Sequence, residues 1–313
     1  MTAKIATREA YGKALVKLGE INKQIVVLDA DLSKSTKTAE FAKVFPERFI
    51  NVGIAEQNLM GTAAGMATVG KIPFVSSFAM FATGRAFEQI RNTIAYPKLN
   101  VKIAATHAGI TVGEDGASHQ TVEDISLMRS IPNMTVIVPS DGIEAEAVIF
   151  AAAEMEGPVY IRLGRLAVPI VNNENYHFEW GKASVLNEGA DITLIGTGIM
   201  VDACLQAREM LEAEGISAGV VNIHTIKPID RETIVKLAQM TGAIVTAEEH
   251  SVIGGLGSAV AEVLSELYPI PMKRVGIEDT FGESGKPLDL LNKYGLNAEN
   301  IVRSAKEVIK RKK

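Results

Sequence analysis

The chain has 313 residues, 47% of them hydrophobic and 22% charged, with a formal net charge of −5. At roughly 150 residues per domain this length corresponds to about two domains, which excludes a peptide hormone or a disulfide-stapled miniprotein, and no apolar run is long enough to cross a bilayer. Because the net charge is negative, the chain offers no general attraction for nucleic acid or anionic lipid, and we expect neither nucleic acid nor a membrane as its partner.

Residues 1–165 alternate short runs of β-branched residues with longer helical stretches, a pattern typical of α/β proteins. Most of these runs are apolar throughout, as expected of strands in a mostly parallel sheet that helices cover on both faces. The expected strands are 25–28, 49–52, 73–76, 101–105, 135–138 and 159–162. The expected helices are 8–21, 36–44, 56–69, 85–94, 122–130 and 143–155. The last helix follows Ser140-Asp141-Gly142, which we expect to cap it.

The alternation of strands and helices stops over 166–182, where Asn, Glu and Pro interrupt any hydrophobic period. We therefore predict a first domain over 1–170, a linker over 171–185 and a second, smaller α/β domain over 186–313. The expected elements of the second domain are strands 192–196, 218–222, 243–248 and 273–275 and helices 201–214, 230–239, 257–267 and 297–310. None of its residues indicates a reaction, so we expect this domain to serve assembly.

Glycine-rich turns in the second half do not complete a nucleotide-binding motif. Gly196-Thr197-Gly198 is followed by Val201 where a dinucleotide fingerprint requires its third glycine. The segment 282–286 has the wrong glycine spacing for a phosphate loop. The segment 254–257 leads into a helix and could present amides to an anion, but we interpret it as a purely structural turn.

Cysteine and histidine usage bears on the compartment and on metal binding. The single cysteine, Cys204, cannot form an internal disulfide, and the N-terminus lacks the apolar core of a signal peptide. We therefore expect a protein of the reducing cytoplasm. The five histidines show no close pairing of the kind that binds zinc, and we expect no metal ligands.

The densest group of polar residues is the loop 106–121, THAGITVGEDGASHQT, which follows an expected strand. Ligands of parallel sheets bind at this edge. Three glycines let the loop bend, so that His107, Asp115 and His119 can converge on a small polar substrate. A hydrogen-bonded structural role would explain either histidine alone, whereas three titratable groups in one loop favour function.

Glu56 begins an expected helix directly after the strand 49–52. An acidic residue there interacts favourably with the helix dipole, by roughly 0.3–1 kcal/mol, and this alone can explain it. Its neighbours are mostly apolar, however, so the carboxylate is equally a candidate for proton chemistry in a partly dry site. The local sequence leaves both interpretations open.

Several motifs in order resemble transketolase, in the part that comprises its pyrimidine-binding and C-terminal domains. The motifs are Thr7-Arg8, Ala30-Asp31-Leu32, Gly53-Ile54-Ala55-Glu56-Gln57, the loop HAGITVGEDGASHQ, Pro139-Ser140-Asp141-Gly142 and Phe281-Gly282-Glu283-Ser284-Gly285-Lys286. The resemblance covers nearly the whole chain. It implies thiamine diphosphate-dependent transfer of a two-carbon ketol unit from a ketose phosphate to an aldose phosphate, a reaction of the pentose phosphate pathway.

The resemblance implies that four residues hold the pyrimidine end of thiamine diphosphate. Glu56 matches the catalytic glutamate that hydrogen-bonds a ring nitrogen of the aminopyrimidine. Phe78 and Phe81 match aromatic residues that pack on the pyrimidine ring, although ordinary core formation also explains two phenylalanines three residues apart. Asp31 matches a residue that lines the cofactor near its thiazolium.

The resemblance also assigns roles in the loop 106–121. His119 matches a catalytic residue that assists proton transfers at the carbonyl or hydroxyl of the donor sugar. Asp115 matches a residue that hydrogen-bonds a sugar hydroxyl and helps to select stereochemistry, and His107 matches one that meets the distal phosphate of the substrate.

Three further residues complete this phosphate site in the match. Arg8, Ser35 and Arg165 supply charge and hydrogen-bond donors that a chain of net charge −5 would otherwise not offer. Arg165 aligns better than Arg162, but the two lie close enough in sequence for either to bind the substrate phosphate.

The chain contains no Gly-Asp-Gly, the motif that, with a later Asn, holds Mg²⁺ and the diphosphate in thiamine diphosphate enzymes. We therefore expect a partner chain, the N-terminal transketolase subunit, to carry the diphosphate-binding domain and the Mg²⁺. The resemblance implies a heterotetramer with a twofold axis, its active sites lying between the two kinds of subunit.

Three other functions stay open. The beta subunit of a 2-oxoacid dehydrogenase has the same two domains and also needs a partner, but a small oxoacid needs no phosphate-binding site. Deoxyxylulose-phosphate synthase is nearer, but that family usually has Asp-Arg where this chain has Thr106-His107. A non-catalytic, partner-binding subunit is the weakest of the three, because Glu56 and both loop histidines are present.

Overall fold

The computed structural model describes residues 3–312, and the largest of its sheets has seven strands, six of them from the N-terminal half of the chain. Its strands follow the order β12-β6-β7-β5-β4-β2-β3, and every neighbouring pair is parallel except β12 with β6. The strands are β2 (Ile25–Asp29), β3 (Phe49–Asn51), β4 (Ile72–Ser76), β5 (Lys102–Ala105), β6 (Thr135–Ile137), β7 (Val159–Arg162) and β12 (Thr225–Lys227). The expected α/β class and mostly parallel sheet are confirmed.

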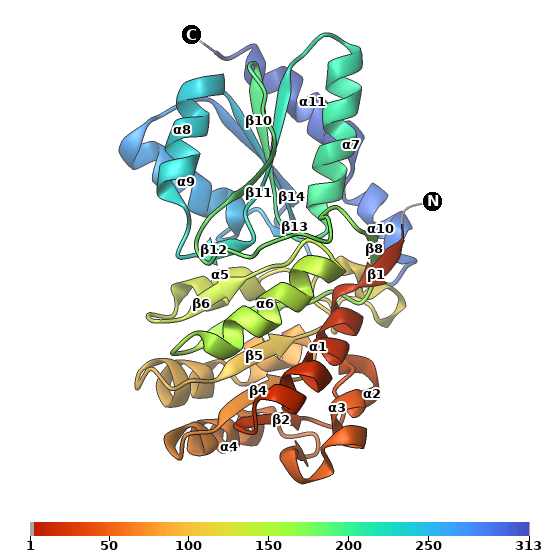
Figure 1. The fold of residues 1–313 in the computed structure, drawn as a ribbon. Helices are drawn as coiled ribbons and strands as arrows, with labels where there is room; N and C mark the ends of the chain where they lie inside the picture. The colour runs from red at the N-terminus through yellow and green to blue at the C-terminus, as the bar shows by residue number, and fades with distance from the viewer. Residues whose placement is uncertain (1–2, 313) are drawn as a thin grey trace.

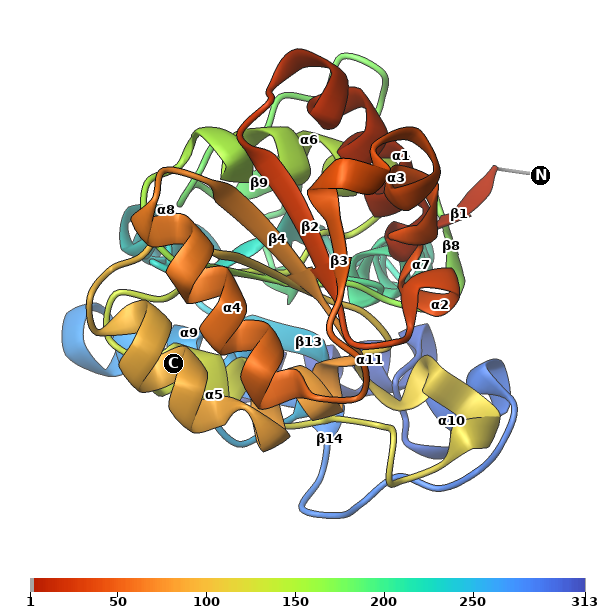
Figure 2. The ribbon, with the colours of Figure 1, turned by 90° about the horizontal axis from the view of Figure 1, so that it is seen from below.

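Helices cover both faces of this sheet (Figure 2). They are α1 (Thr7–Ile21), α2 (Ser33–Thr36), α3 (Ala39–Val44), α4 (Glu56–Thr68), α5 (Asp124–Ser130) and α6 (Gly142–Glu154), with the π-helical segments η2 (Met80–Arg85) and η3 (Gln89–Ala95) and the 3₁₀ segments η1 (Pro46–Arg48) and η4 (Ile110–Asp115). Alternate residues of β2 enter two cores: Ile25 and Val27 pack with α1 and α6, and Val26 and Leu28 pack with α4 and α5. A strand buried on both faces has this apolar sequence.

Two of the expected helices are wrong. The helix 36–44 is interrupted because Lys37 adopts a left-handed conformation with φ of 72°. The hydroxyl groups of Thr36 and Thr38 donate to the buried carboxylate of Asp29, at 2.6 and 2.9 Å, and this local bonding replaces a continuous helix. The helix 85–94 is instead two π-helical segments, the first of which begins at Met80.

The second sheet has five strands in the order β14-β13-β10-β11-β9 and lies beyond the edge strand β12 of the first (Figure 1). Only β9 runs antiparallel to its neighbour. The strands are β9 (Ser184–Asn187), β10 (Ile192–Gly196), β11 (Ala218–Asn222), β13 (Ile244–Ser251) and β14 (Met272–Ile277). The helices are α7 (Met200–Ala213), α8 (Arg231–Thr241), α9 (Leu256–Leu267), α10 (Pro287–Lys293) and α11 (Ala298–Ile309). Short strands β1 (Lys4–Ala6) and β8 (Ala167–Pro169) form an antiparallel pair.

The two halves of the chain interlock. Strand β12 comes from the second half but completes the edge of the first sheet, so the boundaries 1–170, 171–185 and 186–313 stay predictions. Asp141 caps α6 by accepting from the Glu144 amide at 2.8 Å, which confirms the expected cap. Its other oxygen accepts from the amides of Val171 and Asn172, each at 2.8 Å, and so fixes the start of the predicted linker.

We predict that Asp141→Ala lowers the free energy of unfolding by about 3 kcal/mol, because a buried carboxylate that accepts three amide hydrogen bonds is lost. Asn297→Ala is the matched control, since Asn297 caps α11 through one amide only and its loss costs about 1 kcal/mol. Urea denaturation of both variants measures the difference. Equal losses would show that the linker bonds contribute nothing.

Candidate active site

The predicted site residues gather at the carboxyl edge of the first sheet. Segments 30–35, 53–57, 77–85, 106–121 and 163–165 follow β2, β3, β4, β5 and β7, which are neighbours in the parallel sheet. Chains that leave such strands meet at one edge, where ligands of α/β proteins bind. Arg8 reaches the same edge because the Thr7 hydroxyl, at the start of α1, accepts from the Gly164 amide at 2.8 Å.

A row of rings runs along this edge. Phe78 forms a bridge with Thr106 that extends the β4–β5 pairing, and this sets its ring against the next segment. The Phe78 ring stacks on His107 with centroids 3.8 Å apart, and lies 5.9 Å from the nearly parallel ring of Phe81. The His119 ring meets Phe81 edge-on at 5.3 Å. The structure thus brings together four residues that the resemblance assigns to cofactor and substrate.

Glu56 lies at one end of this row. Its side chain is only 2% exposed at the start of α4, and the Nη1 of Arg85 donates to both carboxylate oxygens at 3.0 Å. The Arg85 guanidinium also lies over the Phe81 ring, 4.7 Å from its centroid. The sequence prediction missed Arg85, although its spacing of four residues from Phe81 is the one that brings two side chains together on a helical turn.

His107 lies at the other end of the row, beside Arg8. Burial, and then the positive charges of Arg8 and Arg165, lower the pKa of His107 to about 3, so its ring is neutral at physiological pH. Its Nε2 lies 3.1 Å from the Arg8 Nη1, which can only donate. The proton must therefore sit on Nδ1, which donates to the Thr106 hydroxyl at 2.9 Å.

A cationic pocket of about 440 Å³ opens beside His107. It is lined by Arg8, Lys34, Ser35, Lys37, Phe78, His107, Asp115 and Arg165. All five residues predicted to bind the substrate are among them, whereas the sequence prediction missed the two lysines, which lie in and directly after the short helix α2. The Ser35 carbonyl accepts from Arg8 Nη1 at 2.9 Å and so holds that guanidinium toward the pocket.

The two candidate arginines have different surroundings. Arg165 lies in the pocket, where its Nη1 donates to the Val112 carbonyl and lies 3.7 Å from the nearest carboxylate oxygens of Glu114 and Asp115. Arg162 is buried outside the pocket lining and forms a 2.8 Å ion pair with Asp124. The geometry therefore favours Arg165 over Arg162 as the residue that meets a substrate anion.

Asp31 is exposed. It adopts a left-handed conformation with φ of 63°, and its carboxylate accepts from the Asn51 side chain at 3.2 Å.

Within residues 3–312 no group of three or more His, Cys, Asp or Glu side chains is arranged to hold a metal ion. None of the helices in the described part of the chain is long and apolar enough to span a membrane.

Two family models match the chain: the transketolase pyrimidine-binding domain over residues 3–170 and the transketolase C-terminal domain over residues 181–301. The putative transketolase C-terminal section of Methanocaldococcus jannaschii is 55% identical over 97% of this chain and 96% of its own length. The 6-deoxy-6-sulfo-D-fructose transketolase subunit of Clostridium sp. strain MSTE9 is 47% identical over 97% and 95%. A solved structure named split gene transketolase, inactive beta4 tetramer, is 62% identical, with a TM-score of 0.92 and coverage of 99% of this chain and 100% of that one.

We predict that His107 shows no protonation between about pH 5 and 8 in an NMR titration of its ring nitrogens, because its pKa lies near 3. Arg8→Met should raise the pKa of His107, since removal of a neighbouring positive charge makes the imidazolium less unfavourable. Arg303→Met, which changes an exposed arginine on α11, is the control and should leave the titration unchanged. A midpoint near the usual histidine value in the unmodified chain would contradict the assignment.

Proposed function

The chain belongs to the transketolase family, with that family's pyrimidine-binding domain followed by its C-terminal domain, and from this we propose that it is one subunit of a split, thiamine diphosphate-dependent transketolase. The proposed reaction is transfer of a two-carbon ketol unit from a ketose phosphate to an aldose phosphate. One observation carries the proposal. The row of rings has the buried Glu56 carboxylate and its partner Arg85 at one end and a cationic pocket at the other, and this pocket suits a substrate anion.

The residues present fit the pyrimidine end of the cofactor. The Glu56 carboxylate is engaged by a single nitrogen of Arg85, which leaves acceptor capacity on both oxygens for a ring nitrogen. Phe78 and Phe81 offer the aromatic surface on which a pyrimidine packs, and Asp31 lies at the same sheet edge. When bound, thiamine diphosphate supplies the carbon nucleophile of ketol transfer.

We assign the charge that binds the substrate phosphate to the cations of the pocket. Arg8 and Arg165 present guanidinium groups there, and Lys34 and Lys37 add two ammonium groups. Neutral His107 contributes by accepting from Arg8 and so orienting it. Ser35 does the same through its carbonyl.

The exposed part of the loop supplies the remaining proposed roles. His119 stands at the edge of the Phe81 ring, where it can move a proton at the carbonyl or hydroxyl of the donor sugar. Asp115 lines the pocket and can accept a hydrogen bond from a sugar hydroxyl.

A partner subunit completes the proposed enzyme. The relatives of similar length are named as a C-terminal section, a transketolase subunit and a beta-chain tetramer described as inactive. We propose that an N-terminal transketolase subunit supplies the diphosphate-binding domain and its Mg²⁺, and that the assembly is a heterotetramer with a twofold axis.

The decisive experiment mixes the purified chain with the N-terminal transketolase subunit of the same organism, thiamine diphosphate and Mg²⁺. Xylulose 5-phosphate and ribose 5-phosphate should react only when both chains are present. Glu56→Gln should lower kcat at least a hundredfold, because the isosteric amide cannot share a proton with the cofactor, while gel filtration shows unchanged assembly. Because the Clostridium relative is named for a sulfo-sugar, a ketose ending in sulfonate is a second donor in the assay.

Other outcomes of this assay would overturn the proposal. Full activity of the chain without its partner would exclude a split enzyme. Turnover of pyruvate with glyceraldehyde 3-phosphate would indicate a deoxyxylulose-phosphate synthase, and oxidative decarboxylation of pyruvate a 2-oxoacid dehydrogenase. Assembly without any turnover would leave a non-catalytic subunit, and unchanged turnover in Glu56→Gln would remove Glu56 from the mechanism.

We predict that Arg165→Ala raises KM for phosphorylated donors about tenfold or more, because one charge-assisted contact to the phosphate is lost. KM for unphosphorylated sugars should change less than about threefold, since they lack the anion. Steady-state kinetics with both kinds of donor measure the difference, with Arg303→Ala on the exposed face of α11 as the control. Equal changes for both kinds of donor would place Arg165 outside the phosphate site.

A further inference from the structure

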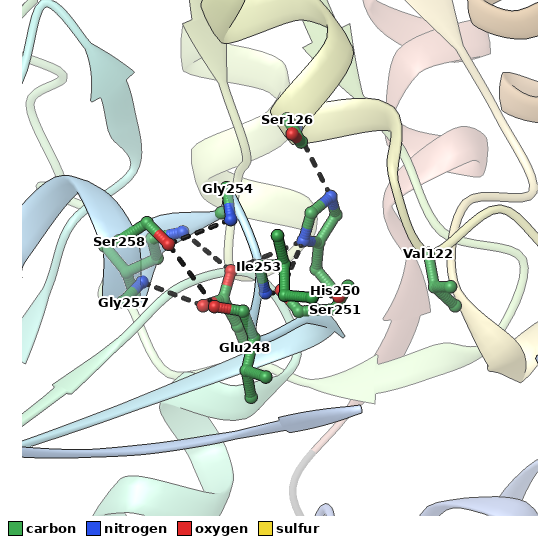
Figure 3. A network of polar contacts seen from close by, with 12 residues as sticks. Val122, Ser126, Glu248, His250, Ser251, Ile253, Gly254, Gly257 and Ser258 are labelled. Atoms are coloured by element: carbon green, nitrogen blue, oxygen red, sulfur yellow. Dashed lines mark hydrogen bonds and ion pairs between the residues drawn. The ribbon is translucent and has the colours of Figure 1, made fainter. Parts of the chain in front are cut away.

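Three consecutive residues at the end of β13 contact three different segments, one in the second half of the chain and two in the first. Glu248 accepts from the amides of Leu256 and Gly257, at 2.6 and 2.8 Å, and so closes the glycine-rich start of α9 (Figure 3). His250 accepts from the Ser126 amide in the first turn of α5 at 3.3 Å. Glu249, between them, reaches the loop 106–121.

The contact of Glu249 with this loop is direct and buried. Its Oε1 accepts from the Thr111 amide at 2.7 Å, and its side chain is 3% exposed. Gly109 lies against the same carboxylate, so closely that a Cβ at this position would collide with it. Gly109 also has a φ of 83°, a backbone conformation that favours glycine. The loop can therefore pack this closely on the Glu249 carboxylate only with glycine at position 109.

Arg162 holds Glu249 in place from the first sheet. Its Nη2 donates to the Glu249 carbonyl at 2.8 Å, and its Nη1 lies 3.9 Å from the Glu249 carboxylate. Its Nε donates to Asp124 at 2.8 Å. One buried guanidinium thus contacts both Asp124 and Glu249, and this fixes the position of the Glu249 side chain beside the loop.

Other side chains hold the loop as well. Arg165 donates to the carbonyl of Val112, the residue next to Thr111. Gln120 donates to the carbonyls of Ile110, at 3.2 Å, and of Glu283 in the second half, at 2.9 Å. The backbone between His107 and Asp115 is therefore fixed at successive peptide groups. Among these contacts, Glu249 is the side chain that accepts from a backbone amide.

We propose that Glu249 is a positioning residue for the loop 106–121, which we call the substrate loop. By accepting from the Thr111 amide, Glu249 fixes the backbone that brings His107 and Asp115 to the cationic pocket. Glu249 touches neither substrate nor cofactor in this role. The kinetic part of the proposal rests on the proposed transketolase function, whereas the structural part concerns this chain alone.

The structural part is tested by hydrogen exchange of the chain alone. Glu249→Met keeps the volume of the side chain but removes the acceptor, and should speed exchange of the Thr111 amide and its neighbours about tenfold or more. Glu249→Gln retains an oxygen and should restore the protection. Glu248→Met is the matched control, equally buried on the same strand, and should speed exchange only at the start of α9.

Unchanged exchange at Thr111 in Glu249→Met would overturn the proposal, and so would equal loosening of the loop in Glu248→Met. If Glu249→Met does not fold, Gly109→Ala decides instead. The added methyl group displaces the loop from the carboxylate and should expose the same amide. Retained protection of Thr111 in Gly109→Ala would contradict the proposal.

In the reconstituted enzyme, Glu249→Met should raise KM for the phosphorylated donor about tenfold while kcat stays within about threefold, since the loop must be ordered before the donor binds. Glu249→Gln should restore KM, and Glu248→Met should change the midpoint of unfolding but not KM. An unchanged KM in an active Glu249→Met enzyme would refute the kinetic part. Absence of ketol transfer in the unmodified complex would refute the proposed function, and the exchange experiment would still decide the role of Glu249.

Discussion

The buried guanidinium of Arg162 is the charge around which the two halves of the chain assemble. Removing an arginine from water costs several kcal/mol, and the cost is offset only where carboxylates and carbonyls surround it. Asp124 comes from the first half of the chain and Glu249 from the second, so the offset is complete only when both are in place. Burial alone would raise the pKa of Asp124, but Arg162 holds it below its usual value, so Asp124 keeps the charge that Arg162 needs.

In the candidate site, Arg8 and Arg165 are positively charged, whereas His107 beside them is neutral. Burial disfavours a positive charge on the His107 ring, and the charges of Arg8 and Arg165 would repel it further. His107 therefore stays neutral, and its Nε2 can accept from Arg8. The flat imidazole also stacks on Phe78, so one side chain ends the row of rings and orients the first cation of the pocket.

The sequence predicts regular elements well and contacts between distant elements poorly. The run 25–28 is apolar throughout because helices cover both faces of the sheet, and this unbroken apolar run identifies the strand. The helix 36–44 fails because the two hydroxyl groups at its start prefer Asp29, seven and nine residues earlier, over a helical turn. Arg85 is missed as the partner of Glu56 because it lies 29 positions later in the sequence, at the end of a π-helical segment. The roles at the site came from the resemblance, and only geometry separates Arg165 from Arg162.

The glycine-rich turn 254–257 shows how the second half contributes without chemistry of its own. Its amides do bind an anion, but the anion is the chain's own Glu248, and a Cβ at Gly255 would collide with that carboxylate. Burial raises the pKa of Glu248 to about 7, and the hydrogen bonds from the Gly257 and Leu256 amides limit that rise. The turn is structural, as its sequence indicates. Because Glu249 and His250, the next two residues of β13, reach the loop 106–121 and α5, this closed turn anchors the strand that supports the site in the first half.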